Sequence, residues 1–132
     1  MAERTYLIDS HCHLHDQEFF APATQLSGLK NAKINQVDKI VCIGTDHQDS
    51  LNAQRFVQEH PESHLFWSYG IHPSEWQASR SAVDFEKQEC PPIAIGEVGL
   101  DYHYGSLDQK QQIALFEEMI QLAIDQNLPL IF

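Results

Sequence analysis

Short apolar runs alternate with segments of helical periodicity along the 132 residues of the chain. The short runs are rich in apolar and β-branched residues, which predicts strands at 5–8, 38–43, 65–69, 92–95 and 128–132. Between them, apolar residues recur every three or four positions. This spacing predicts helices over 19–34, over 50–60 and between Ser106 and Asn127, with a weaker short helix within 75–89.

Polar residues mark the ends of these predicted helices. Gly44, Thr45 and Asp46 end the second strand and offer an N-cap for the helix that follows. Ser106 with Gln109 three residues later resembles a capping box, and Asn127 can end the last helix in a left-handed conformation. That helix carries the clearest apolar stripe, formed by Ile113, Phe116, Ile120 and Ala123.

The predicted order, β-α-β-α-β-α-β-α-β, is typical of an α/β protein. Such alternation predicts a parallel sheet with right-handed crossovers. Because the sequence stops inside an apolar strand, we expect 1–132 to be the N-terminal half of a truncated (β/α)8 TIM barrel, a fold that needs about 250 residues. A complete five-stranded doubly wound sheet is the alternative.

The composition favours a folded, acidic protein. Hydrophobic residues make up 42% of the chain, and 8 Lys and Arg against 19 Asp and Glu give a net charge of −11. This balance argues against a sequence-independent nucleic-acid coat, although bound divalent cations can reverse the local field of an enzyme. The three cysteines show no paired spacing, which favours a reducing cytosol, and we expect neither a signal peptide nor a membrane segment.

Two histidines follow the first apolar run. His11 and His13 are two positions apart, a spacing that places both rings on the same side of a strand. Neutral imidazole is a common ligand of zinc and similar ions, and Asp9 could support these rings from a second shell. Cys12 would point the other way, into the core. The alternative is a polar strand end that faces solvent.

A carboxylate follows the fourth predicted strand. Glu97 lies between Gly96 and Gly99, and the carboxyl ends of buried strands are where parallel α/β proteins keep their chemistry. We expect Glu97 to meet His11 and His13 at a metal site. A carboxylate there could bridge two ions, an arrangement that suits phosphodiester cleavage. A helix-capping or surface carboxylate is the alternative.

Further polar residues follow the third and fourth strands. His72 lies in the segment 70–73, where Pro73 disfavours helix, and Asp101 and Tyr102 come shortly after Glu97. All three are candidates for substrate contact. A structural turn for His72 and a merely polar loop for the other two residues are the alternatives.

Taken together, the segments 8–14, 70–73 and 94–102 resemble the motifs of the TatD family of metal-dependent hydrolases, in the amidohydrolase-like superfamily. Their order and spacing match over essentially the whole chain, as does the long helix with Gln111, Phe116, Gln121 and Ala123 that leads to Pro129. The resemblance implies a barrel that binds two divalent ions (Zn, Mn or Mg) and cleaves DNA, often as a 3′-5′ exonuclease. It implies that His11 and His13 hold one ion and that Glu97 bridges both.

The family pattern also implies two further His ligands and an Asp on later strands, and these positions lie beyond this sequence. We therefore expect weak metal binding and little or no activity from the chain alone. Two alternatives remain open. One is an amide or lactone hydrolase of the same superfamily. The other is a non-catalytic half barrel, whose open edges would pair with a second copy or with a missing C-terminal half.

Overall fold

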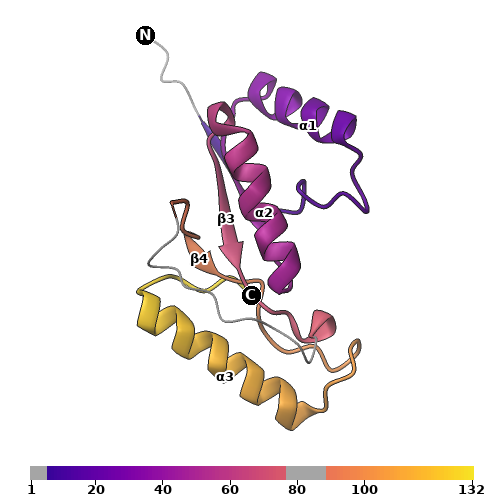
Figure 1. The fold of residues 1–132 in the computed structure, drawn as a ribbon, viewed down its shortest axis with the longest axis vertical. Coiled ribbons are helices and arrows are strands. Elements are labelled where there is room, and N and C mark those ends of the chain that lie inside the picture. Colours follow the sequence, from indigo (N-terminus) through magenta and orange to yellow (C-terminus); the bar gives the residue numbers. More distant parts are fainter. Residues whose placement is uncertain (1–5, 77–88) are drawn as a thin grey trace.

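The computed structural model describes residues 6–76 and 89–132. Strands and α-helices alternate along most of this part of the chain (Figure 1). The elements are β1 (Leu7–Cys12), α1 (Pro22–Ile34), β2 (Val37–Ile43), α2 (His47–Glu59), the 3-10 turn η1 (Pro61–Ser63), β3 (Leu65–Tyr69), the 3-10 turn η2 (Pro73–Glu75), β4 (Ala94–Ile95) and α3 (Gln109–Gln126).

The strands form one parallel sheet in the order β1-β2-β3-β4. The segment after α3 continues this order, because Leu130 forms a parallel bridge with Ile95 of β4. A doubly wound sheet reverses its strand order at a switch point, whereas sequential order is that of a (β/α)8 barrel. The predicted fold class, a curled half barrel, is therefore confirmed, and the doubly wound alternative is wrong.

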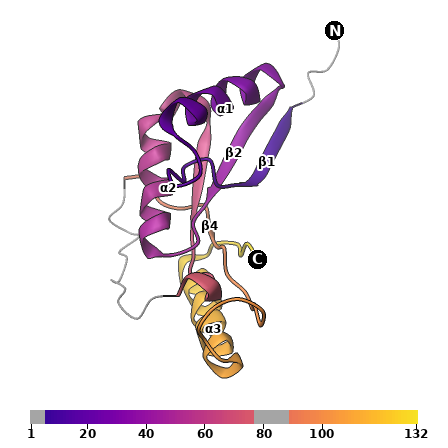
Figure 2. The same cartoon turned by 90° about the vertical axis from the view of Figure 1, so that its right-hand side faces the viewer.

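The hydrophobic core lies between the sheet and its helices. Figure 2 shows α1 and α2 together on one side of β1 and β2, with α3 next to β4. Trp67 of β3 is only 1% exposed and packs in the same cluster as Phe56 of α2 and Met119 of α3. No helix within the described residues combines the length and apolar character needed to cross a membrane.

Side-chain caps decide where two helices begin. The carboxylate of Asp46 accepts a hydrogen bond from the backbone N–H of Asp49 at 2.7 Å, which confirms the expected cap and starts α2 three residues before the predicted position. The last helix begins at Asp108, not at Ser106. Asp108 and Gln111 form a reciprocal capping box with two hydrogen bonds of 2.9 Å, which satisfies two N–H groups of the first turn.

Other predicted boundaries shift for identifiable reasons. The first helix starts at Pro22, not at residue 19, because a residue before proline avoids the helical conformation and Ala21 is extended. The first strand runs on from Leu7 to Cys12 rather than ending at residue 8. The short helix expected within 75–89 falls largely outside the described residues.

The buried stripe of α3 also differs from the prediction. Ile113 is 43% exposed, whereas Gln112 is 2% exposed and Leu115, Met119 and Ala123 complete the buried face. Gln112 tolerates burial because its side-chain amide bonds the backbone of Asp101. The end of α3 is as predicted, since Asn127 adopts φ 52° and ψ 44°.

Candidate metal centre

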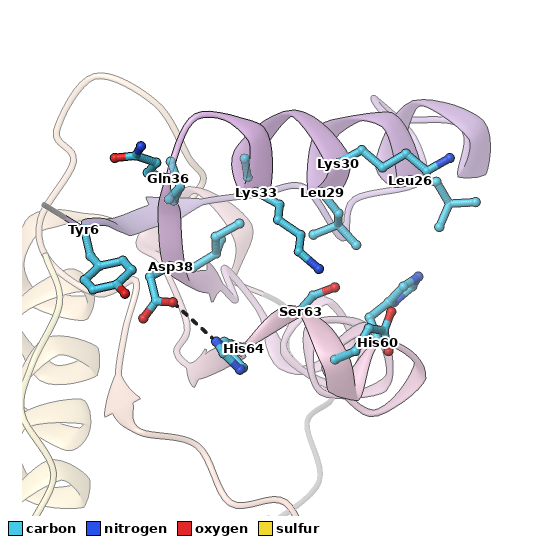
Figure 3. Close-up of a pocket in the computed structure, with 14 residues that line it drawn as sticks. Tyr6, Leu26, Leu29, Lys30, Lys33, Gln36, Asp38, His60, Ser63 and His64 are labelled. Carbon is cyan, nitrogen blue, oxygen red and sulfur yellow. Dashed lines mark ion pairs between the residues drawn. The ribbon is translucent and has the colours of Figure 1, made fainter. Parts of the chain in front are cut away.

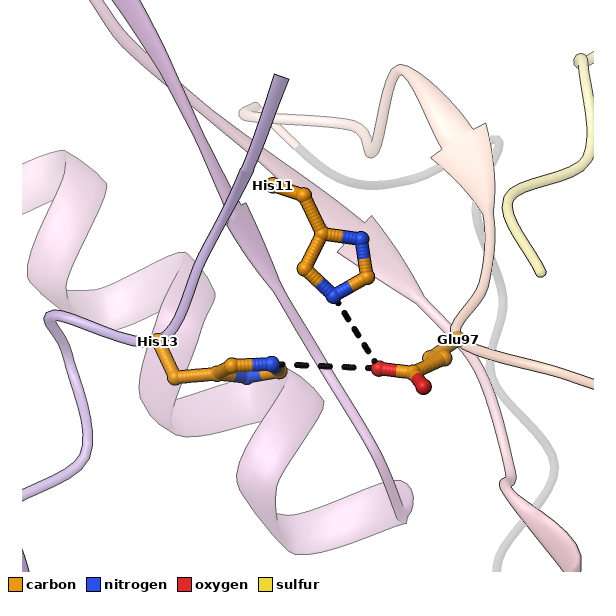
Figure 4. Close-up of side chains that lie close together, drawn as sticks. All are labelled: His11, His13 and Glu97. Carbon is orange, nitrogen blue, oxygen red and sulfur yellow. Dashed lines mark ion pairs between the residues drawn. The ribbon is translucent and has the colours of Figure 1, made fainter. Parts of the chain in front are cut away.

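Three side chains from opposite ends of the sequence meet at the carboxyl ends of the strands (Figure 4). The Nε2 atom of His11 lies 3.2 Å from Oε2 of Glu97, and the Nε2 atom of His13 lies 3.8 Å from the same oxygen. One ligand atom of each residue lies within 4.8 Å of the other two. The structure thus brings together the three residues singled out from the sequence.

The two histidines come from the end of β1. His11 lies on the strand and His13 directly follows it, after an irregular step in the pairing of β1 with β2 between Asp9 and Cys12. Cys12, between them, pairs with Cys42 of β2 and packs against the hydrophobic core. The alternation of a strand therefore separates the imidazoles from the thiol, as expected.

Glu97 is held by the backbone of the neighbouring strand ends. Its N–H donates to the carbonyl of Gly44 at 2.7 Å, just beyond β2, and the N–H of Gly96 donates to the carbonyl of Tyr69 at 2.7 Å. The Gly96–Glu97 peptide bond is cis. A Cβ atom on Gly70 would lie 2.2 Å from the carbonyl carbon of Gly96, so the strand ends approach more closely than any side chain allows.

The ring of His13 has a defined orientation. Its Nδ1 lies 3.0 Å from the carbonyl of Ile43, an oxygen that can only accept, so Nδ1 carries the proton. The lone pair of neutral His13 is therefore on Nε2, which faces Glu97. This pairing of one ring nitrogen with a backbone carbonyl is typical of histidines that bind metals.

The spacing of these atoms fits a bound cation. With bonds of about 2.1 Å, two ligand atoms on one tetrahedral or octahedral ion lie roughly 3.0–3.4 Å apart. The His11 to Glu97 distance of 3.2 Å falls in this range, and the His13 ring needs only a small shift from 3.8 Å. The side chains are 42%, 37% and 27% exposed for His11, His13 and Glu97, so solvent and further ligands can reach the centre.

Asp9 supports this centre through the backbone. Its Oδ1 accepts a hydrogen bond from the backbone N–H of His11 at 3.1 Å. The contact stabilises the irregular end of β1, on which His11 lies. Within the described residues, Asp9 makes no hydrogen bond to either imidazole ring, so its expected direct support of the rings stays a prediction.

The other candidate residues are engaged in their own loops. Nδ1 of His72 lies 2.6 Å from Oγ of Ser74, which orients the ring at the start of η2. The carboxylate of Asp101 accepts backbone N–H bonds from Tyr104 and His103, and these bonds lower its pKa below the ordinary value. Tyr102 is 56% exposed. In residues 6–76 and 89–132, no hydrogen bond or ion pair joins these three residues to the metal-site cluster.

A buried polar network beside the centre was not predicted. His15 is 2% exposed, and its Nε2 lies 3.0 Å from Oδ1 of Asp49. The other oxygen of Asp49 accepts bonds from the backbone N–H and the hydroxyl of Thr45 at 2.9 and 3.0 Å. Burial alone would raise the pKa of Asp49, but the bonds from His15 and Thr45 outweigh it and the pKa lies below the ordinary value. The repeat of histidine at every second position from 11 to 15 was the available signal.

The chain is similar to metal-dependent hydrolases. It is 30% identical over 137 residues to an uncharacterized metal-dependent hydrolase of Buchnera aphidicola, covering 96% of this chain and 51% of the relative. It is 33% identical over 106 residues to the 3′-5′ ssDNA/RNA exonuclease TatD of Erwinia tasmaniensis, covering 76% of this chain and 40% of the relative. The chain thus spans about half the length of the curated relatives it matches.

The fold is also similar to that of a solved structure. The crystal structure of YJJV, a TatD homologue of Escherichia coli, superposes with a TM-score of 0.71 at 22% identity, over 94% of this chain and 49% of that one. The family model of TatD-related DNases matches residues 8–132, which include every residue of the candidate metal centre. The chain therefore belongs to the TatD-related DNase family.

Proposed function

We propose that this chain carries one half of the active site of a metal-dependent hydrolase that cleaves phosphodiester bonds of DNA in the manner of a 3′-5′ exonuclease. The observation that carries the proposal is the convergence of two Nε2 atoms and one carboxylate at the open ends of parallel strands. The name of the Erwinia relative, an exonuclease acting on single-stranded DNA and RNA, supports this choice of substrate.

In this proposal, each residue of the centre has a distinct task. His11 and His13 would hold one divalent ion through Nε2, and Glu97 would be a ligand common to two ions. Zn, Mn and Mg are the candidate metals, since all accept oxygen ligands and the imidazoles favour the first two. When bound, such a pair supplies an activated water and stabilises negative charge on the phosphate. The carbonyl of Ile43 keeps His13 in the tautomer that can bind.

His72, Asp101 and Tyr102 are proposed to contact the substrate. The imidazole of His72 is fixed by Ser74 on its Nδ1 side, which leaves Nε2 for a phosphate oxygen. Tyr102 is exposed and offers a ring on which a base can stack. With a net charge of −11, the chain repels DNA unless cations are bound, so we expect metal to be needed for substrate binding as well as for chemistry.

We further propose that residues 1–132 are the N-terminal half of a barrel and associate with a second copy or with a C-terminal half in the cytosol. Within the described residues, β1 pairs with β2 alone, and Tyr6, Leu7 and Ile8 are 57%, 54% and 62% exposed. An edge strand with exposed apolar residues favours pairing with another chain. A monomeric mass by light scattering at micromolar concentration, together with a cooperative thermal transition, would contradict self-association.

Release of nucleotides from single-stranded DNA tests the activity. The purified chain is incubated with a 3′-labelled oligonucleotide and Mn²⁺, Mg²⁺ or Zn²⁺. We expect slow release that chelator abolishes, that Glu97→Gln removes and that Glu117→Gln leaves unchanged, since Glu117 is an exposed carboxylate on α3.

Two results would overturn this proposal. Equal release by the chain and by Glu97→Gln would remove the assigned centre from the reaction. Turnover of amide or lactone substrates without any release from DNA would favour the alternative hydrolase of the same superfamily.

A further inference from the structure

A cavity lies at the opposite ends of the strands from the candidate metal centre. Its volume is about 690 Å³, and it opens between α1, the start of β2 and the connection from α2 to β3 (Figure 3). β2 begins at this cavity with Val37 and Asp38, and ends beside Glu97. Seven residues of strand at about 3.3 Å each separate the two sites by roughly 20 Å. The cavity shares no residue with the centre formed by His11, His13 and Glu97.

The floor of this cavity is apolar. Leu29 of α1 and Ile40 of β2 line it and are 9% and 5% exposed, so they belong to the hydrophobic core. Tyr6, which is 57% exposed, lies at one flank beside Asp38. A flat, partly apolar ligand that packs on Tyr6 could therefore remove this ring from water. The volume lies within the range of about 300–1,000 Å³ that is usual for small-molecule sites.

The rim of the cavity is less acidic than the protein as a whole, because two ammonium groups balance its two carboxylates. Two of the 8 Lys and Arg residues, Lys30 and Lys33, line it from one side of α1. Neither ammonium group forms an ion pair with a carboxylate of the described residues. In Figure 3 the side chain of Lys33 points into the cavity, toward the side of Ser63.

The two rim carboxylates, Asp38 and Glu62, equal the lysines in number, but among the described ion pairs neither is joined to a lysine. Oδ1 of Asp38 lies 3.6 Å from Nδ1 of His64, so this carboxylate already has a partner within the rim. Glu62 is exposed. His60 packs its ring against Phe56 and donates from Nδ1 to the carbonyl of that residue at 2.9 Å, which leaves Nε2 for a ligand. Ammonium, imidazole and hydroxyl groups above an apolar floor form a site for an anion with a flat organic part.

We infer that this cavity binds a small organic phosphate with a planar ring, of the nucleoside monophosphate class. The phosphate lies against Lys33 and Ser63, with Lys30 farther along α1, and the ring lies toward Tyr6 above Leu29 and Ile40. The inference does not depend on the proposed function, because it uses none of the residues of the metal centre. It concerns binding alone and includes no chemical step.

Titration with deoxyadenosine monophosphate tests the inference. Binding to the full chain is followed by isothermal calorimetry and by amide NMR shifts, with inorganic phosphate and deoxyadenosine as separate probes. We expect saturable binding of the nucleotide, with shifts concentrated in residues 26–40 and 60–64. The two separate probes should each bind at least about tenfold more weakly, since each keeps only part of the contacts.

Variants separate this site from a general charge effect. Lys30→Gln combined with Lys33→Gln should weaken nucleotide binding about tenfold or more, whereas Lys110→Gln, an exposed lysine of α3, should leave it unchanged. Circular dichroism establishes that each variant is folded. His11→Ala should bind the nucleotide as the unmodified chain does, which distinguishes this cavity from the metal centre.

Several outcomes would overturn the inference. These are the absence of nucleotide binding at millimolar concentration, unchanged binding in the double variant, equal losses with Lys110→Gln, and NMR shifts centred on His11 and Glu97. If the double variant is unfolded, the NMR shifts of the unmodified chain still decide the matter, because they locate the nucleotide directly.

Discussion

Replacing Asp49 by alanine should destabilise the fold strongly, because this carboxylate joins two loops next to the metal centre. It accepts hydrogen bonds from His15 at 3.0 Å and from the backbone and hydroxyl of Thr45 at 2.9 and 3.0 Å. Hydrogen bonds to a charged group contribute about 1.5–3 kcal/mol each. The three bonds go to the same carboxylate and are not additive, so their sum is an upper bound for the loss of unfolding free energy.

The ring of His15 sets the smallest loss of unfolding free energy that we expect for Asp49→Ala. Its Nδ1 is buried and has no hydrogen-bond partner among the residues that the structure describes, so loss of Asp49 would leave both ring nitrogens unsatisfied. A buried unsatisfied polar atom costs about 1–3 kcal/mol, and loss of a negative charge from the first turn of α2 adds about 0.3–1 kcal/mol. We therefore expect the free energy of unfolding to fall by about 3 kcal/mol, a large part of the 5–15 kcal/mol typical of a domain.

Urea unfolding followed by tryptophan fluorescence measures this effect. Trp67 is 1% exposed and should report the loss of the core. Glu59→Ala, which removes an exposed carboxylate from the last turn of the same helix, is the control and should change the free energy by less than about 0.5 kcal/mol. A decrease below about 1 kcal/mol for Asp49→Ala would refute the argument, because it would mean that His15 finds water or another partner.

The same network predicts a pH dependence. The pKa of Asp49 in the folded protein lies below the ordinary value of 3.8, so its charged form stabilises the fold. This contribution is complete above pH 3.8 and is lost as the pH falls through the lower, folded value. The stability difference between the unmodified chain and Asp49→Ala should therefore shrink in acid. A difference that stays constant down to pH 2 would mean that the charge of Asp49 has no role.

Three further perturbations test the metal centre and the packing around it. Saturating Zn²⁺ or Mn²⁺ should raise the melting temperature of the chain, by an amount equivalent to about 2.7 kcal/mol at one hundred times the dissociation constant, and His11→Ala should remove this shift. Gln112→Leu should lower the free energy of unfolding by about 2–4 kcal/mol in urea, because the partly buried backbone N–H and carbonyl of Asp101 lose their bonds of 2.8 and 2.7 Å. Gly70→Ala should unfold at lower urea concentration or fail to fold, since the new Cβ would lie 2.2 Å from the carbonyl carbon of Gly96.

Each of these predictions has a control. A metal-induced shift that survives in His11→Ala would place the ion elsewhere. Gln121→Leu removes an exposed amide from the same helix, so it should change the free energy by less than about 0.5 kcal/mol. Gly28→Ala is the control for Gly70→Ala, because the three atoms nearest to its new Cβ outside its own helix backbone are side-chain atoms of Leu14, and alanine favours a helix. Equal losses at both glycines would contradict the argument from close packing.

The position of the metal centre follows from the sequence with few assumptions. His11 and His13 at one strand end and Glu97 at another must lie near each other if all strands are parallel, and the structure brings their ligand atoms within 4.8 Å. Their binding of metal stays a prediction. The fold class was equally accessible, because the alternation of strands and helices permits few topologies.

The rules for helix caps and apolar periodicity gave the wrong position where two neighbouring residues could both fill it. Ser106 and Asp108 are both good caps, and periodicity does not show that Asp108 will gain a reciprocal bond from Gln111. Likewise, a polar residue is not expected in a buried stripe, so the stripe of α3 was placed one residue too late, at Ile113 rather than Gln112. Only the contact with Asp101, a tertiary feature, decides the phase of this helix.

The network of His15, Asp49 and Thr45 and the cavity near Lys33 were beyond the reach of these rules. Both combine residues from separate segments, none of which stands out alone. Their recognition requires the distance between side chains rather than their spacing along the chain.

The consecutive carbonyls of Ile43 and Gly44 determine which parts of the chain can vary in sequence without disturbing the candidate metal centre. The ring of His13 and the backbone of Glu97 are both anchored there, on one dipeptide of an inner strand. Residues of the candidate centre that lie far apart along the chain are thus held in place by the same two neighbouring carbonyl groups. Insertions or deletions in the connections between strands can accumulate without altering the distance between imidazole and carboxylate. Conversely, any substitution that moves this dipeptide would displace both ligands at once, so evolution should vary the loops freely and leave the end of β2 almost untouched.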